Sequence, residues 1–505
     1  MKKINIIVLS VLIILVLSVL AYVSKIGYAN IADKPHLPEV ENLSLDEVGL
    51  VDGQPGGERA KLYEKSTGLF YYEGDEARSV LEDNLDIDPT KPIVIFTHGM
   101  LYDGGYDMRL RFREKDIWQD AGYNAFVFRW SQLSDDIDFN SIEKKIWTRA
   151  DHPFAYKDEF GKRQVAYKKD CYSVAEIFGA FYNEFMTNYD INAPEIRFLG
   201  HSMGGDLAMG VSSYIYTLVD KGVMEDRFMF TRVVMLDPFV SSMKNEMYVP
   251  WLDKTVAEEG SARLYVDVIN KYKEIGIAVE YIHSGYADIL GDKQDIKLLE
   301  EAAAFIKVDS SYIEGSIDDV IANRHQVAVD WYSESMEYKY WDSSVANLNY
   351  AMSASVPTPF VGGQFGGIYK MVKNTTRCVC DDEIYSTGFD SARIVGYAFK
   401  DTNNNGIMDG SFATRYEGVK VKLYNNDILI STKLTNRGGF YRFNLDESYV
   451  GKELHIVTED ITPTKVNLDE TICSSYKNSI NEDLKSSKFT LNHKNQIFVK
   501  NIGIK

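Results

Sequence analysis

The chain has 505 residues, of which 45% are hydrophobic, and it carries a formal net charge of −19 at pH 7. This length exceeds that of one typical domain, and the balanced composition excludes a fibrous or wholly disordered chain. A strongly negative protein repels the phosphate backbone, so the charge argues against a nucleic-acid partner. We therefore expect two or three folded units with an acidic surface.

Residues 1–29 have the pattern of an export signal. Lys2 and Lys3 precede an almost unbroken apolar run over residues 4–23. A run of this length is able to span a bilayer, and the paired lysines place its start on the cytoplasmic side. Because Gly27 and Ala29 also offer a signal-peptidase site, a cleaved signal peptide and a retained membrane anchor both stay open. Either outcome predicts a secreted or cell-surface protein, with membrane association through the N-terminus if the anchor is kept.

An N-terminal extension over residues 30–90 precedes a region, residues 91–345, in which short apolar runs alternate with longer amphipathic stretches. This alternation is typical of parallel strands joined by crossover helices, and it predicts an α/β fold with a mostly parallel central sheet. The expected strands cover residues 93–97, 125–130, 196–200, 233–237 and 277–283. The expected helices cover residues 173–189, 206–220 and 262–274.

The character of the sequence changes after residue 345. Residues 346–390 include a Ser-, Pro- and Gly-rich stretch without clear periodicity, which predicts a linker. Residues 391–505 contain alternating segments separated by Asn, Asp and Gly turns, which predict a small all-β sandwich. The four cysteines, Cys171, Cys378, Cys380 and Cys473, allow three pairings and indicate no zinc site by their spacing.

The pentapeptide Gly200-His201-Ser202-Met203-Gly204 stands between an expected strand and an expected helix. This context fits a nucleophile elbow, in which flanking glycines let the strand and helix approach closely around an exposed serine. Ser202 is the predicted nucleophile, and the amide of Met203 is a predicted oxyanion donor. Met100, in the loop Thr97-His98-Gly99-Met100 after the first expected strand, is the predicted second donor.

A general base and an acid should follow the nucleophile in the order serine, acid, histidine. His325, placed in a loop that opens a helix over residues 327–336, is the predicted base, whereas His283 ends a strand and is expected to pack near the site. Asp237 ends the first strand after the elbow helix and is the predicted acid. Asp288, after the following strand, is the alternative acid.

These motifs resemble the pancreatic lipase family of α/β-hydrolases over about residues 92–336. The resemblance involves Thr97-His98-Gly99, the elbow, Met235-Leu236-Asp237-Pro238 and the region around Arg324-His325. It implies a lipase-like serine hydrolase with an early acid, which favours Asp237 over Asp288. The sequence departs from the family where its lid loop is expected, because residues 291–321 lack cysteines and contain a predicted helical run over residues 298–306.

Residues from about 392 onward resemble the prealbumin-like or SdrD B-like repeats of bacterial surface proteins. The segment 401–409, Asp-Thr-Asn-Asn-Asn-Gly-Ile-Met-Asp, corresponds to the signature of those repeats. Asp401, Asn403, Asn405 and Asp409 could together supply carboxylate and amide oxygens to a calcium ion, although an EF-hand's downstream glutamate is missing. A turn that binds no metal is the alternative.

The sequence as a whole predicts an α/β-hydrolase joined to a C-terminal β-sandwich. We expect it to cleave carboxylic esters, lipids included, through an acyl-enzyme on Ser202 with Asp237 and His325 and without a cofactor for catalysis. The same elbow serves thioesterases and peptidases, which stay open as alternatives. A non-catalytic cell-surface binding protein is the remaining alternative.

Overall fold

The computed structural model describes residues 43–45, 47–48, 67–100, 112–136, 139–149, 154–157, 162–166, 172–240, 247–256, 261–285, 293–311, 313–337, 354–362, 368–372, 383–386, 391–408, 412–469, 476–492 and 496–505. The predicted signal or anchor segment and all four cysteines lie outside these residues. Among the described residues, no helix is both long and apolar enough to cross a bilayer.

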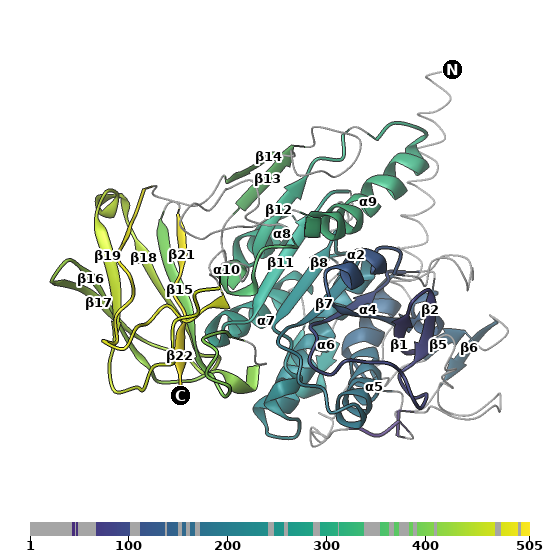
Figure 1. The fold of residues 1–505 in the computed structure, drawn as a ribbon. Coiled ribbons are helices and arrows are strands. Elements are labelled where there is room, and N and C mark those ends of the chain that lie inside the picture. The colour runs from purple at the N-terminus through teal and green to yellow at the C-terminus, as the bar shows by residue number, and fades with distance from the viewer. Residues whose placement is uncertain are drawn as a thin grey trace, which may run out of the picture. The chain divides into compact units, whose positions relative to one another are not determined.

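A ten-stranded sheet forms the centre of the first part of the chain, in the order β14-β13-β12-β11-β8-β7-β3-β4-β1-β2 (Figure 1). Neighbouring strands are parallel from β13 through β4 in this spatial order. At the two edges, β14 pairs antiparallel with β13, and β1 pairs antiparallel with both β4 and β2. The strands are β1 (Thr67–Glu73), β2 (Glu76–Ser79), β3 (Ile93–Thr97), β4 (Asn124–Trp130), β7 (Ile196–His201), β8 (Arg232–Leu236), β11 (Ala278–His283), β12 (Ala304–Val308), β13 (Ile368–Val372) and β14 (Glu383–Ser386). The mostly parallel sheet predicted from the sequence is therefore present.

Helices cover both faces of this sheet, which explains why the central strands are apolar on both sides. Apolar side chains of α4, α5, α6, α7 and α8 form one core with one face, and those of α2, α9 and α10 form a second core with the other. The helices are α2 (Lys115–Asp120), α3 (Ser131–Ser134), α4 (Phe139–Trp147), α5 (Val174–Asn188), α6 (Met203–Asp220), α7 (Ser261–Ile275), α8 (Lys293–Ala302), α9 (Ile317–Glu334) and α10 (Thr358–Gly362). Two short hairpins, β5 (Phe154–Lys157) with β6 (Arg163–Ala166) and β9 (Met247–Val249) with β10 (Lys254–Val256), complete this part.

Three expectations about local structure need correction. The predicted helix over residues 298–306 ends at Ala302, and Ala304–Val308 is instead the buried strand β12, because a short apolar run fits a strand and a helix equally well. The predicted linker over residues 346–390 contains β13 and β14, which extend the sheet. The predicted N-terminal extension over residues 30–90 likewise contributes β1 and β2.

Two four-stranded sheets form the C-terminal β-sandwich, in agreement with the sequence. One contains β18-β15-β21 with β22 also on β15, and the other is β17-β16-β19-β20. The strands are β15 (Ala392–Lys400), β16 (Lys420–Asn425), β17 (Ile428–Leu434), β18 (Phe440–Leu445), β19 (Glu453–Thr458), β20 (Phe489–Thr490), β21 (Ile497–Val499) and β22 (Ile502–Ile504). Tyr397 of β15 donates its hydroxyl to the carbonyl of Gly276 at 2.5 Å, and the rings of Tyr397 and Phe440 belong to the second core of the first part.

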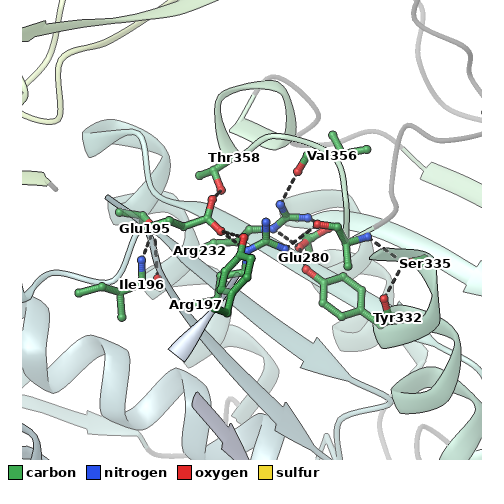
Figure 2. Close-up of polar contacts among 12 residues, drawn as sticks. Glu195, Ile196, Arg197, Arg232, Glu280, Tyr332, Ser335, Val356 and Thr358 are labelled. Carbon is green, nitrogen blue, oxygen red and sulfur yellow. Dashed lines mark hydrogen bonds and ion pairs between the residues drawn. The ribbon is translucent and has the colours of Figure 1, made fainter. Parts of the chain in front are cut away.

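A buried ion pair, Arg232 with Glu280, connects β8 and β11 (Figure 2). Arg232 binds both carboxylate oxygens of Glu280, at 2.6 and 2.9 Å, and both side chains are 0% exposed. Glu280 also accepts the hydroxyl of Tyr332 from α9 at 2.7 Å, and Arg232 donates to the carbonyl of Val356 at 2.6 Å. This bidentate geometry with further partners is what a buried charge pair requires.

A second pair, Arg197 with Glu195, lies beside it at the start of β7. Arg197 pairs with Glu195 and donates to the carbonyl of Ala354 at 2.7 Å, while Thr358 donates its hydroxyl to Glu195 (Figure 2). The pairing holds the pKa of Glu195 at about 2, because the cations Arg197 and Arg232 outweigh the penalty of burial. The two pairs together fix residues 354–358 against the strands.

Candidate active site

The nucleophile elbow has the geometry that its sequence predicts. Ser202 separates β7 from α6 and adopts φ 58° and ψ −127°, a conformation that non-glycine residues rarely hold. A Cβ on Gly200 would lie 1.9 Å from the carbonyl oxygen of Gly204, and a Cβ on Gly204 would lie 2.6 Å from that of Thr97. Glycine is therefore required at both positions for the strand, the helix and the neighbouring loop to meet.

The loop after β3 lies directly against the nucleophile. A Cβ on Gly99 would lie 2.5 Å from the Cβ of Ser202. Met100 follows Gly99 and is partly buried against the core, and Met203 is the first residue of α6, where a backbone N–H has no acceptor within the helix. The two predicted oxyanion donors thus belong to segments that flank Ser202.

Asp237 follows β8 and is completely buried with a positive φ of 42°. Its Oδ1 accepts the backbone N–H groups of Ser284 at 2.9 Å and Gly285 at 3.0 Å. Burial alone would raise the pKa of Asp237, but hydrogen bonds from His283 and His325 outweigh it and hold the pKa well below its usual range. The carboxylate is therefore ionised throughout the neutral range.

The structure brings His325 and Asp237 together. His325 Nδ1 lies 2.5 Å from Asp237 Oδ2, and the His325 side chain is 23% exposed. His325 lies inside α9, which begins at Ile317, so the expectation of a loop histidine opening a helix over residues 327–336 was wrong. The alternative acid, Asp288, lies outside the described residues.

Sequence reasoning assigned no role to His201, although it adjoins the nucleophile. Its Nε2 lies 3.1 Å from the carbonyl oxygen of His325, and the two rings are 4.4 Å apart. A carbonyl only accepts, so His201 must carry its proton on Nε2. Burial, reinforced by the nearby His325, lowers the pKa of His201 to about 3 and keeps the ring neutral.

His98 is also a neutral ring with a defined tautomer. Its Nδ1 lies 2.8 Å from the carbonyl oxygen of Gly99 and must donate, whereas its Nε2 accepts the backbone N–H of Trp130 at 3.3 Å. Burial lowers the pKa of His98 to about 4. His98 therefore shapes the loop that lies against Ser202.

The predicted calcium loop is held by its own hydrogen bonds. Both carboxylate oxygens of buried Asp401 accept backbone N–H groups, from Asn405 at 3.2 Å and Gly406 at 2.8 Å. Asn403 and Asn405 each accept one further backbone N–H. Asp409 lies outside the described residues, and no group of three acidic, histidine or cysteine ligands occurs among those described.

The elements that carry Ser202, Asp237 and His325 meet at the carboxyl edge of the sheet. Ser202 follows β7, Asp237 follows the adjacent β8, and His325 lies in the helix after β12. The fold is that of an α/β-hydrolase. A serine on such an elbow beside an Asp–His pair is able to attack a carbonyl carbon and pass its proton to the imidazole.

No family model and no curated protein sequence matches the chain. Among solved structures, it is similar to Est1E from Butyrivibrio proteoclasticus, with 12% identity over 53% of this chain and 91% of that chain and a TM-score of 0.26. It is also similar to the Pyrococcus furiosus esterase Pf2001, with 16% identity over 42% and 68% of the two chains and a TM-score of 0.24. The shaft pilin SpaA from Lactobacillus rhamnosus GG shows 14% identity over 23% and 50%, with a TM-score of 0.13. Likenesses at this level of identity and TM-score do not establish the activity of this chain.

Proposed function

We propose that this protein is a serine hydrolase that cleaves carboxylic esters through an acyl-enzyme on Ser202. The observation that carries the proposal is the 2.5 Å contact between His325 and Asp237, next to an elbow that holds Ser202 in a strained conformation. The hydrogen bond from His201 to the carbonyl of His325 holds His325 next to that elbow.

In this reaction the Ser202 hydroxyl oxygen attacks the ester carbonyl while its proton moves to His325 Nε2. Asp237 stabilises the resulting imidazolium, and the amides of Met100 and Met203 donate to the oxyanion. The imidazolium then protonates the departing alcohol as the carbon–oxygen bond breaks. Water, deprotonated by His325, releases the acid and restores Ser202.

Lipid esters are the proposed substrate class. The acid after β8, one strand beyond the nucleophile, occupies the position expected from the resemblance to the pancreatic lipase family. Thioesters and peptide bonds are attacked by the same machinery and are the competing substrates. Export through the N-terminal segment would place the enzyme in the secreted or surface-exposed fraction, where such lipids are encountered.

Hydrolysis of p-nitrophenyl esters of increasing chain length tests the proposal, alongside a thioester and a peptide substrate. We expect Ser202→Ala to lower kcat by roughly 10⁴-fold or more. Ser212→Ala, which removes a buried hydroxyl elsewhere on α6, should leave kcat unchanged. Turnover of the thioester or peptide alone would contradict the ester proposal.

Calcium binding by the loop at Asp401 is a separate proposal. Each carboxylate oxygen of Asp401 accepts one backbone N–H group. Carboxylate and amide oxygens have a second lone pair, which could bind a calcium ion. Calorimetric titration with calcium should then give binding that Asp401→Asn weakens. Equal heats for the two proteins would contradict a calcium site.

A further inference from the structure

The hydroxyl of Ser284 bonds to the backbone of α9 on both sides of His325. In an α-helix, the N–H of Ala328 would donate to the carbonyl of Arg324, four residues earlier. Here Ser284 Oγ donates to the Arg324 carbonyl at 2.8 Å and accepts the Ala328 N–H at 2.9 Å. One side chain that follows β11 therefore bridges the two backbone groups of the helix turn that spans His325.

The next carbonyl of α9 is also held from outside the helix. It belongs to His325 itself and accepts His201 Nε2 at 3.1 Å. The backbone on both sides of the His325 Cα is thus fixed by residues that follow β11 or end β7. The position of the imidazole is consequently set by these strand ends as well as by the helix.

The same end of β11 holds the carboxylate partner. His283 Nδ1 lies 2.9 Å from Asp237 Oδ1, and the N–H groups of Ser284 and Gly285 donate to that same oxygen. The other oxygen, Oδ2, contacts His325. Three neighbouring residues therefore orient the carboxylate so that one oxygen faces the histidine.

We propose that His283 and Ser284 are positioning residues that set the geometry between Asp237 and His325. Ser284 fixes the helix turn that carries the base, and His283 fixes the carboxylate oxygen that the base does not use. The kinetic tests of this inference rest on the proposed function. The Asp237–His325 hydrogen bond can also be observed directly, without a substrate. Small displacements at such a site reduce rate strongly while leaving substrate binding nearly unchanged.

Ser284→Ala removes the hydroxyl but keeps the backbone N–H that binds Asp237. We expect kcat to fall by about 10- to 100-fold with KM within about twofold of wild type. The acid limb of the kcat/KM profile should move to lower pH, because a loosened Asp237 contact stabilises the His325 imidazolium less. Ser284→Thr keeps a hydroxyl and should recover part of the loss.

Ser335→Ala is the matched control. Ser335 is also buried, and its hydroxyl donates to the carbonyl of Tyr332 at 2.6 Å and accepts the N–H of Ala354 at 2.8 Å. Ser335 directly follows α9, and its hydroxyl likewise bridges a backbone carbonyl of α9 and a backbone N–H, ten residues from His325 in sequence. We expect it to lower stability without changing kcat or the acid limb.

Proton resonances of ¹⁵N-histidine-labelled protein give a readout that needs no substrate. The downfield Nδ1–H signal of His325, assigned by its absence from His325→Gln, should shift or broaden in Ser284→Ala and persist in Ser335→Ala. If the wild type cleaves no ester yet shows this pattern, the positioning role stands and the proposed substrate fails.

His283 is tested with two replacements. His283→Asn retains a donor near the position of Nδ1 and should keep most of the activity, whereas His283→Phe removes the donor and should lose about tenfold or more in kcat. Equal activity of the two variants would overturn the role of His283. A Ser284→Ala protein with wild-type kcat, acid limb and His325 resonance would overturn the role of Ser284.

Discussion

Strands β7, β8 and β11 have polar side chains near both ends, and the charged groups at the two ends differ in their partners and in their exposure. Near the strand starts, Arg197, Arg232 and Glu280 form the buried pairs of Figure 2, with Arg232 and Glu280 both 0% exposed. At the carboxyl ends, Asp237 is equally buried, but its partner His325 is 23% exposed. One end holds charges paired to one another, while the other holds a charge whose partner is accessible to a substrate.

The difference separates stability from reactivity within one sheet. A buried cation with a buried anion gives a fixed arrangement with no accessible proton donor, which suits a structural connection between strands, α9 and residues 354–358. A buried anion beside a partly exposed imidazole gives a base that is oriented and still able to exchange a proton. The following predictions test this separation.

The largest effect is expected from Asp237→Asn. The amide cannot stabilise the imidazolium and favours the wrong histidine tautomer, so kcat should fall by roughly 10⁴-fold. Ester hydrolysis at saturating substrate measures the change, and Asp288→Asn serves as the control. A greater loss in Asp288→Asn than in Asp237→Asn would transfer the acid role to Asp288.

Arg232→Met should affect stability much more than rate. Its removal leaves Glu280 buried without its cation, a change that costs about 3–5 kcal/mol in unfolding free energy. Urea denaturation measures this cost, and the double variant Arg232→Met with Glu280→Leu should recover much of it. A loss of kcat in folded Arg232→Met as large as that in Asp237→Asn would refute the separation of the two ends.

Gly285→Ala places a methyl group between the two catalytic partners. Its Cβ would lie 2.5 Å from Asp237 Oδ2 and 2.9 Å from the His325 Cα, so the pair must move apart. We expect kcat to fall by about 100-fold. Gly418→Ala, at a positive-φ position with nothing within 4 Å, should cost about 1 kcal/mol in stability and leave kcat unchanged.

The smallest effect concerns a buried carboxyl on the elbow helix. Burial, with Glu143 nearby, raises the pKa of Asp206 well above its usual range, and the group accepts Trp147 Nε1 at 2.7 Å. At neutral pH the folded state therefore keeps a proton on Asp206 that the unfolded state releases. The contribution of Asp206 to the free energy of unfolding is most favourable at low pH and declines as the pH rises above about 4. The stability of Asp206→Asn relative to wild type should increase as the pH rises above about 4. Thermal unfolding at several pH values measures this difference, and a difference that does not change with pH would contradict the prediction.

Local patterns predicted the elbow and the strand-end position of Asp237, because glycine spacing and a short apolar run define those features within a few residues. The role of Ser284 could not be predicted, since its partners on α9 are 40 and 44 residues away in sequence. The helical periodicity before His325 is weak, so the sequence predicts a loop there, although α9 begins at Ile317. Strand β12 and the sheet extension by β13 and β14 were missed because their pairing with distant strands defines them.

Labelling with a fluorophosphonate, followed by mass spectrometry of the intact protein and its peptides, tests the central claim most directly. We expect one adduct per chain on Ser202, which is absent from Ser202→Ala and forms much more slowly in Asp237→Asn. An unlabelled wild type, or an adduct that persists in Ser202→Ala, would contradict a serine hydrolase built on this elbow.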